Sequence, residues 1–73
     1  MLRLRIKELL EEQGHTKYWL YKQMGLSYQN LNKVIENQTT QIRFDTIERL
    51  VEILGCDIGE LFEYEKDDEQ EEL

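Results

Sequence analysis

The densest group of side chains that could do chemistry lies near the middle of the chain, where a phenol, three amides and an amine follow one another. Gln29, Asn30 and Asn32 can each donate and accept hydrogen bonds, and Lys33 can donate to acceptor atoms of a partner. Tyr28 adds a hydroxyl and a flat apolar ring. Groups of this kind can read the donor and acceptor atoms on base edges. Taken without its surroundings, such a run is more often only the solvated face of a helix.

Residue sets for catalysis or metal binding are missing from the sequence. His15 is the single histidine, and its position beside Gly14 predicts an exposed turn residue rather than a metal ligand or a general base. There is no glycine-rich phosphate loop, and the acidic residues near the C-terminus lack the spacing of a calcium loop. Cys56 is the single cysteine, which excludes an internal disulfide, favours a reducing compartment and is typical of a small buried residue. We expect no enzyme activity, no cofactor and no metal.

The polar run is the outer face of a helix predicted over residues 28–36, with Ser27 as its N-cap. A shorter helix is predicted over residues 17–24, with Thr16 as its N-cap and Gly25 after its end. Two short helices joined by a three- to four-residue turn containing glycine form a helix-turn-helix, which lays its second helix in the major groove of DNA. The apolar residues on the inner side of that second helix are Leu31, Val34 and Ile35.

Three more helices are expected around this pair. The first spans residues 2–13. Asp45 with Glu48 predicts a capping box in the first turn of a fourth helix, and Asp57 with Glu60 predicts another that opens a short fifth helix. No strand pattern is present. The apolar stripes behind these predictions are Leu2, Ile6, Leu9 and Leu10 in the first helix, Ile47, Leu50, Val51 and Leu54 in the fourth, and Ile58, Leu61 and Phe62 in the fifth.

The net charge of −7 belongs entirely to the C-terminal end. Residues 1–59 carry eight basic and eight acidic side chains, whereas residues 60–73 carry eight acids and only Lys66 as a base. From Glu65 onward the single apolar residue is Leu73. We therefore expect one domain over residues 1–64 and an acidic, disordered tail over residues 65–73.

The helix pair resembles the helix-turn-helix of the Cro and phage-repressor (XRE-like) transcription regulators. The matching residues are Thr16-Lys17-(x)2-Leu20-(x)3-Met24-Gly25-Leu26-Ser27-(x)3-Leu31-(x)2-Val34. Downstream, the end of that family is matched by Arg43-Phe44 and by Leu54-Gly55-Cys56-(x)3-Glu60-Leu61-Phe62. The resemblance covers residues 3–63. It implies an all-α, compact five-helix, lambda-repressor-like DNA-binding domain, followed here by the acidic C-terminal tail.

The resemblance also implies a function and a set of site residues. The chain would be a sequence-specific transcription regulator, with repression as the expected sign, acting in the cytoplasm as a homodimer on double-stranded DNA. The expected base-reading residues are Tyr28, Gln29, Asn32 and Lys33. The expected phosphate-binding residues are Lys17, Ser27, Asn37, Thr40 and Arg43.

The sequence departs from the family pattern in three respects. Tyr21 stands where a small residue is usual, so its ring must leave sideways or shift the helix pair. Leu10 and Trp19 stand where an arginine and a glutamate often pair, so an apolar contact replaces an ion pair. Asn37 stands where glycine usually ends the second helix in the left-handed conformation.

A protein-interaction module on the same fold is the alternative, such as an antitoxin or a polymerase-contacting accessory factor. The neutral body, the acidic tail and the aromatic residues within 18–21 favour it, with the fifth helix as a second candidate contact surface. The tail could also mimic DNA and compete for the basic residues. No apolar run approaches the ~18 residues of a membrane span and no signal peptide is recognisable, so no membrane partner is expected.

Overall fold

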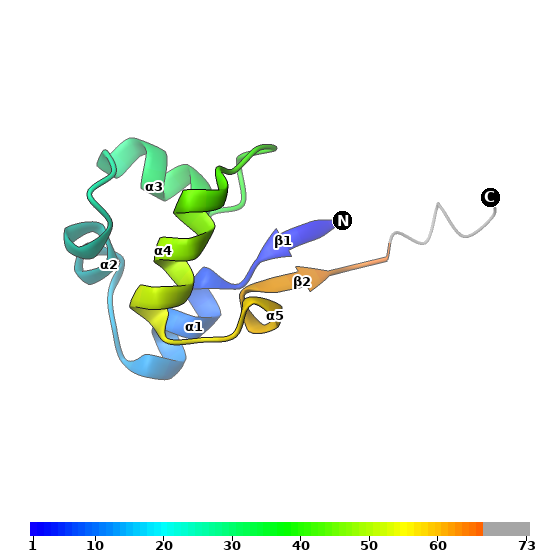
Figure 1. Cartoon of the computed structure of the whole chain (residues 1–73), viewed down its shortest axis with the longest axis horizontal. Coiled ribbons are helices and arrows are strands. Elements are labelled where there is room, and N and C mark those ends of the chain that lie inside the picture. The colour runs from blue at the N-terminus through cyan, green and yellow to red at the C-terminus, as the bar shows by residue number, and fades with distance from the viewer. Residues whose placement is uncertain (67–73) are drawn as a thin grey trace.

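The computed structural model describes residues 1–66, which form five helices and two short strands (Figure 1). The predicted mainly helical, five-helix architecture is confirmed. Most of the tail predicted over residues 65–73 lies outside the described residues. In chain order the elements are β1 (Leu2–Leu4), α1 (Ile6–Gln13), α2 (Lys17–Met24), α3 (Tyr28–Ile35), α4 (Phe44–Leu54), α5 (Ile58–Leu61) and β2 (Phe62–Tyr64).

The predicted N-caps of the central helix pair are confirmed. The Thr16 hydroxyl accepts a hydrogen bond from the Trp19 amide at 3.1 Å, and the Ser27 hydroxyl accepts one from the Asn30 amide at 3.2 Å. Each bond satisfies an amide that the first turn of a helix leaves without a backbone partner. Local sequence signals thus fix where α2 and α3 begin.

The two predicted capping boxes have different outcomes. The box at the start of α5 is confirmed, because the Asp57 amide donates to the Glu60 carboxylate at 2.9 Å and the reciprocal bond is also present. The box predicted from Asp45 is wrong. Helix α4 begins two residues earlier than this box implies, at Phe44, and its N-cap Arg43 makes no side-chain capping bond. Asp45 instead binds the Arg43 guanidinium, so a charged neighbour outside the helix has replaced the capping role.

Two sequence predictions are wrong: that the chain has no strands, and that the first helix starts at residue 2. Strands β1 and β2 pair antiparallel, with Leu4 opposite Phe62 and Leu2 opposite Tyr64. Helix α1 starts only at Ile6. The physical reason is that the pairing joins segments about sixty residues apart, and three-residue strands carry too little local pattern to be recognised.

The hydrophobic core lies between the helices and the inner side of the sheet. None of the described residues contributes a buried polar or charged side chain to it, so packing of apolar side chains carries the stability. Helix α2 packs against α4, and in Figure 1 α4 lies between the α2–α3 pair and the strands. The buried residues are Leu4, Ile6, Leu9, Leu10, Leu20, Met24, Leu31, Val34, Ile35, Leu50, Leu54 and Leu61.

Some apolar residues expected inside are not. Ile58, predicted to face inward from the fifth helix, is 61% exposed, whereas Leu61 is fully buried. Ile58 is the first residue of this four-residue helix and Leu61 is the last, and of the two only Leu61 reaches the core. Leu2, predicted on the inner stripe of the first helix, is 62% exposed on β1. Cys56 is half-buried rather than buried, and this burial raises the pKa of its thiol.

Asn37 joins the end of α3 to the outer edge of β1. Its side-chain oxygen accepts from the Leu4 amide at 2.6 Å, and its side-chain amide donates to the Leu4 carbonyl at 3.0 Å. The predicted left-handed conformation is confirmed, with φ of 58°. Because asparagine tolerates this conformation and carries both a donor and an acceptor, it ends the helix and occupies the edge of the strand at once.

Candidate nucleic-acid interface

The candidate interface is built on α2, the turn at Gly25 and α3. Gly25 has φ of 74°, in the left-handed region that favours glycine, and this allows the chain to reverse direction between the helices. Leu20 and Met24 are buried on the inner face of α2. On α3, the inner residues Leu31 and Ile35 are buried as well. The packing of both inner faces leaves the opposite face of α3 in solvent.

That outer face carries the polar residues predicted from the sequence. Gln29, Asn30 and Lys33 are exposed, and Tyr28 is 51% exposed. Within residues 1–66, the side chains of Gln29 and Lys33 form no hydrogen bond or ion pair. Their donors and acceptors are therefore available to a partner.

Asn32, a predicted base-reading residue, lies differently from these neighbours. It is half-buried, and its side-chain oxygen accepts a hydrogen bond from the Lys17 ammonium group at 3.2 Å. Lys17 in turn binds the Glu36 carboxylate at 2.6 Å. The structure thus brings Asn32 against the start of α2, whereas Gln29 and Lys33 point to solvent.

Glu36 is the centre of an ion-pair network that the sequence predictions did not include. Its second oxygen binds the Lys7 ammonium group at 2.7 Å, so it links α1, α2 and the end of α3. Hydrogen bonds from Lys17, and then from Lys7, lower the pKa of the Glu36 carboxyl group. The positions Asn32 and Glu36, four residues apart on one helix face, could have suggested that both meet one cation.

Tyr21, the bulky residue at a usually small position, directs its ring toward the first turn of α3. It is half-buried against the core, and its ring centre lies 5.4 Å from that of Tyr28 in an edge-to-face arrangement. On the other side, its ring centre is 6.2 Å from that of Tyr18. The ring is therefore in contact with Tyr28 at the first turn of α3 and with the core.

The predicted phosphate-binding residues after α3 have different surroundings. Asn37 uses both polar groups of its side chain on Leu4, as described above. Thr40 is exposed. The Arg43 side chain is 83% exposed but holds Asp45 through two hydrogen bonds of 3.0 and 3.1 Å, which raise the pKa of Arg43.

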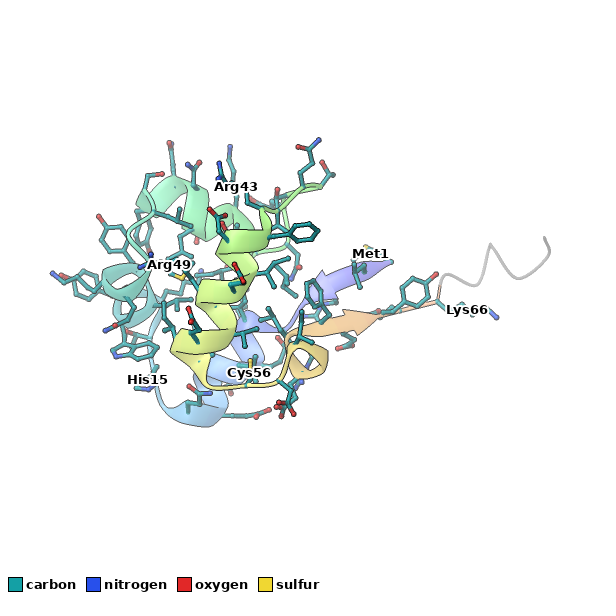
Figure 2. The ribbon with its side chains drawn as sticks, in the orientation of Figure 1. Met1, His15, Arg43, Arg49, Cys56 and Lys66 are labelled. Atoms are coloured by element: carbon teal, nitrogen blue, oxygen red, sulfur yellow. The ribbon has the colours of Figure 1, made fainter. Side chains whose placement is uncertain are left out.

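A shallow hollow joins the outer face of α3 to the start of α4. Figure 2 shows Arg43 at that end of α4, on the side of the molecule where α3 lies. The hollow brings the cations Lys33 and Arg43 to one surface, although they come from different elements. It also includes Asn30 and Gln41, which were not among the predicted site residues. Gln41 lies in the loop, where periodicity gives no signal for the direction of a side chain.

The single histidine does not lie with this group. The ring of His15 stacks on that of Trp19, with 3.6 Å between the ring centres and 4° between the planes. Among residues 1–66, no three His, Cys, Asp or Glu side chains are grouped so that they could hold a metal ion. The same residues include no helix long and apolar enough to cross a bilayer.

The arrangement has the features of a helix-turn-helix: two short packed helices, a glycine turn and an exposed polar face on the second helix. The family model of the Cro/C1-type helix-turn-helix DNA-binding domain matches residues 5–67. The chain belongs to the Cro/C1-type DNA-binding family. This match covers most of the chain and confirms the family and the fold class inferred from the sequence.

One solved structure supports the Cro/C1-type assignment. It is the crystal structure of a provisionally assigned DNA-binding protein from Bacteroides fragilis, with a TM-score of 0.75 and 32% sequence identity. The similarity covers 86% of this chain and all of the other. No curated protein matches the sequence.

Proposed function

We propose that this Cro/C1-type domain is a sequence-specific transcription regulator that represses by inserting α3 into the major groove. The observation that carries the proposal is the exposed face of α3, where Gln29 and Lys33 have no protein partner among the described residues. An α-helix fits the major groove, and its side chains reach base edges there. A domain that only occupies a promoter can lower transcription, because it blocks access of polymerase.

Base reading is assigned to four side chains at the first two turns of α3. Gln29 has the geometry to bind adenine through two hydrogen bonds, and Lys33 can donate to guanine. Asn32 has its oxygen engaged by Lys17, so its amide hydrogens are the groups left for a base. The fourth base-reading residue is Tyr28.

Backbone contacts are assigned to residues around the same face. Ser27, at the N-terminus of α3, and Thr40 and Arg43, beside the hollow after it, suit phosphate oxygens. Lys17 can reach phosphate once it leaves Glu36. Asn37 is assigned to positioning this loop, since its side chain already binds Leu4.

A homodimer on a partly symmetric site is the proposed assembly. One helix-turn-helix makes few base contacts, and two-fold dimers place their α3 helices on half-sites about one turn, or ~34–36 Å, apart. Phe44 and Ile58 are large apolar side chains that are 86% and 61% exposed, which supports a contact through the start of α4 and through α5. Phe44→Ser with Ile58→Ser should shift the protein toward monomer in sedimentation without unfolding it. A dimer of unchanged strength would place the contact elsewhere.

Selection of bound sequences from a randomised duplex library tests the reading face. The wild-type protein should enrich a short, partly symmetric site. The double variant Gln29→Ala with Lys33→Ala should bind that site no better than random DNA while keeping the helical circular dichroism spectrum. The matched control Lys22→Ala with Gln23→Ala removes the same types of side chain from α2. Specific binding that survives the α3 changes would show that the reading face is wrong.

Binding to another protein, as an antitoxin or an accessory factor does, is the second candidate. The aromatic surface of α2 favours it, because Tyr18 is 62% exposed and lies beneath the Lys22 ammonium group at 5.7 Å from its ring centre. The two candidates differ in their response to salt. DNA binding weakens with a log–log slope of roughly −0.9 per phosphate contacted, whereas an apolar protein contact changes far less.

A further inference from the structure

Three tyrosines form a continuous line from the outer surface of α2 to the first turn of α3. Tyr18 is exposed, Tyr21 is half-buried against the core, and Tyr28 is half-exposed at the end that points into solvent beside the reading face. The ring centres of successive members are 6.2 and 5.4 Å apart. Tyr28 is thus the terminal member of a supported aromatic line.

Tyr21 restricts where the Tyr28 ring can go. The two rings meet edge to face at 70° between their planes, an arrangement that aromatic quadrupoles favour. Because Tyr21 packs against the core, it cannot move away without loss of burial. The Tyr28 hydroxyl forms no hydrogen bond within the described part of the chain. The ring is therefore held in place while its remaining surface stays free for a partner.

A fixed aromatic surface has one natural apolar target in the major groove. Base edges there offer nitrogen and oxygen acceptors, amino donors and a single apolar group, the 5-methyl of thymine. The adjacent Gln29 is suited to adenine. Tyr28 and Gln29 would therefore both favour A·T base pairs. Hydrogen bonding to a base would not require a large aromatic ring at position 28. Contact with a methyl group would use the apolar surface of that ring.

We propose that Tyr28, positioned by Tyr21, selects a pyrimidine that carries a 5-methyl group. The proposal rests on the insertion of α3 into the major groove and adds the chemical group that one position of the site must present. Thymine satisfies it, and so does 5-methylcytosine. Removal of the methyl group should cost about fourfold in affinity, the change expected when one methyl-sized group is no longer buried.

The experiment uses the site recovered by selection and replaces each thymine in turn with deoxyuracil, which lacks only the methyl group. One position in each half-site should lose about fourfold in affinity with the wild-type protein. Tyr28→Ala should bind the thymine and deoxyuracil duplexes equally at that position. Tyr28→Phe should keep the preference, because the ring and not the hydroxyl makes the contact. With cytosine at the position, methylation at C5 should strengthen binding by wild type and by Tyr28→Phe, but not by Tyr28→Ala.

Tyr21 is a positioning residue, and its variant has a separate readout. Tyr21→Leu keeps an apolar side chain against the core but removes the ring edge, so the thymine preference should fall while specific binding persists. Tyr18→Leu is the control and should leave the preference unchanged.

Two results would overturn the proposal without affecting the reading face. One is equal binding of all single deoxyuracil duplexes and the thymine duplex by wild type. The other is loss of the preference in Tyr28→Phe, which would assign the contact to the hydroxyl. Failure to recover any specific site would instead remove the function on which the proposal rests.

Discussion

At the scale of single residues, Glu36 links the stability of the fold to the proposed interface. Its carboxylate holds Lys17, which the family resemblance assigns to the DNA backbone, and Lys7 from α1. If Lys17 binds a DNA phosphate, that phosphate must compete with Glu36 for it. Both partners are partly exposed, so the ion pair contributes little to stability, but it alters the charge presented to DNA.

Glu36→Gln should strengthen binding to random DNA at low salt by roughly fivefold, the order expected from one unit charge at close range in water. The change frees Lys17 and removes a negative charge near the phosphates. Fluorescence anisotropy with a labelled random duplex measures it. Glu52→Gln makes the same charge change at an exposed position of α4. Equal gains in the two variants would mean that only net charge matters.

The stability of the protein should depend on the same carboxylate in acid. The pKa of Glu36 is lowered in the folded state, so the stabilisation is present above the carboxyl pKa of the unfolded chain, about 4.3. It is lost as the pH falls through the lower folded-state value. Urea unfolding of wild type and Glu36→Gln should show a small difference in stability at pH 6, and this difference should disappear near pH 3. A difference that is independent of pH would exclude this linkage.

At the scale of elements, two contacts between distant segments complete the fold around the helix pair. The β1–β2 ladder joins the two ends of the domain, and Asn37 fastens the outer edge of β1 to the end of α3. Arg3 and Glu63 add an ion pair of 3.0 Å across the ladder. The position of α3 is thus coupled to the first strand as well as to the core.

Variants of Asn37 should separate its backbone role from its side-chain role. Asn37→Gly keeps access to the left-handed conformation but loses both bonds to Leu4, which leaves a backbone amide and a carbonyl unpaired at a cost of about 1–3 kcal/mol in the free energy of unfolding. Asn37→Ala should cost more, because alanine also strains at positive φ. Urea titration gives both values. A glycine variant as stable as wild type would show that the two bonds contribute nothing net.

At the scale of the whole molecule, charge is divided between a neutral body and an acidic end. Five of the acidic residues lie at positions 67–72, beyond the part of the chain that the structure describes. Glu65 is within it, and its backbone amide binds the Met1 carbonyl at 2.8 Å. A truncation that removes acidic charge without disturbing the ladder must therefore start after Lys66.

Removal of residues 67–73 changes the net charge from −7 to −2. If these acids compete with phosphate for the basic residues, affinity for random DNA should rise several-fold at low salt, and the gain should shrink at high salt because of screening. Replacement of the five acids by Asn and Gln keeps the length and should give the same result. Unchanged affinity in both proteins would remove the competing role of this segment.

The family, the five helices and most helix ends could be predicted from the sequence, because caps, left-handed terminators and apolar periodicity act within a few residues. Thr16, Ser27 and Asn37 were correctly interpreted for this reason. The polar face of α3 also followed from periodicity, since three buried positions define the opposite side.

The contacts between distant elements became visible only in the folded domain. The strand pair, the bonds from Asn37 to Leu4 and the Lys17–Glu36 contact each join segments far apart in the chain, and no local signal specifies them. Ile58 is exposed and Leu61 is buried, although the two positions share one face of the same short helix. Contacts between residues that are far apart in the sequence form only when the whole domain packs. For this reason they could not be predicted from local sequence patterns.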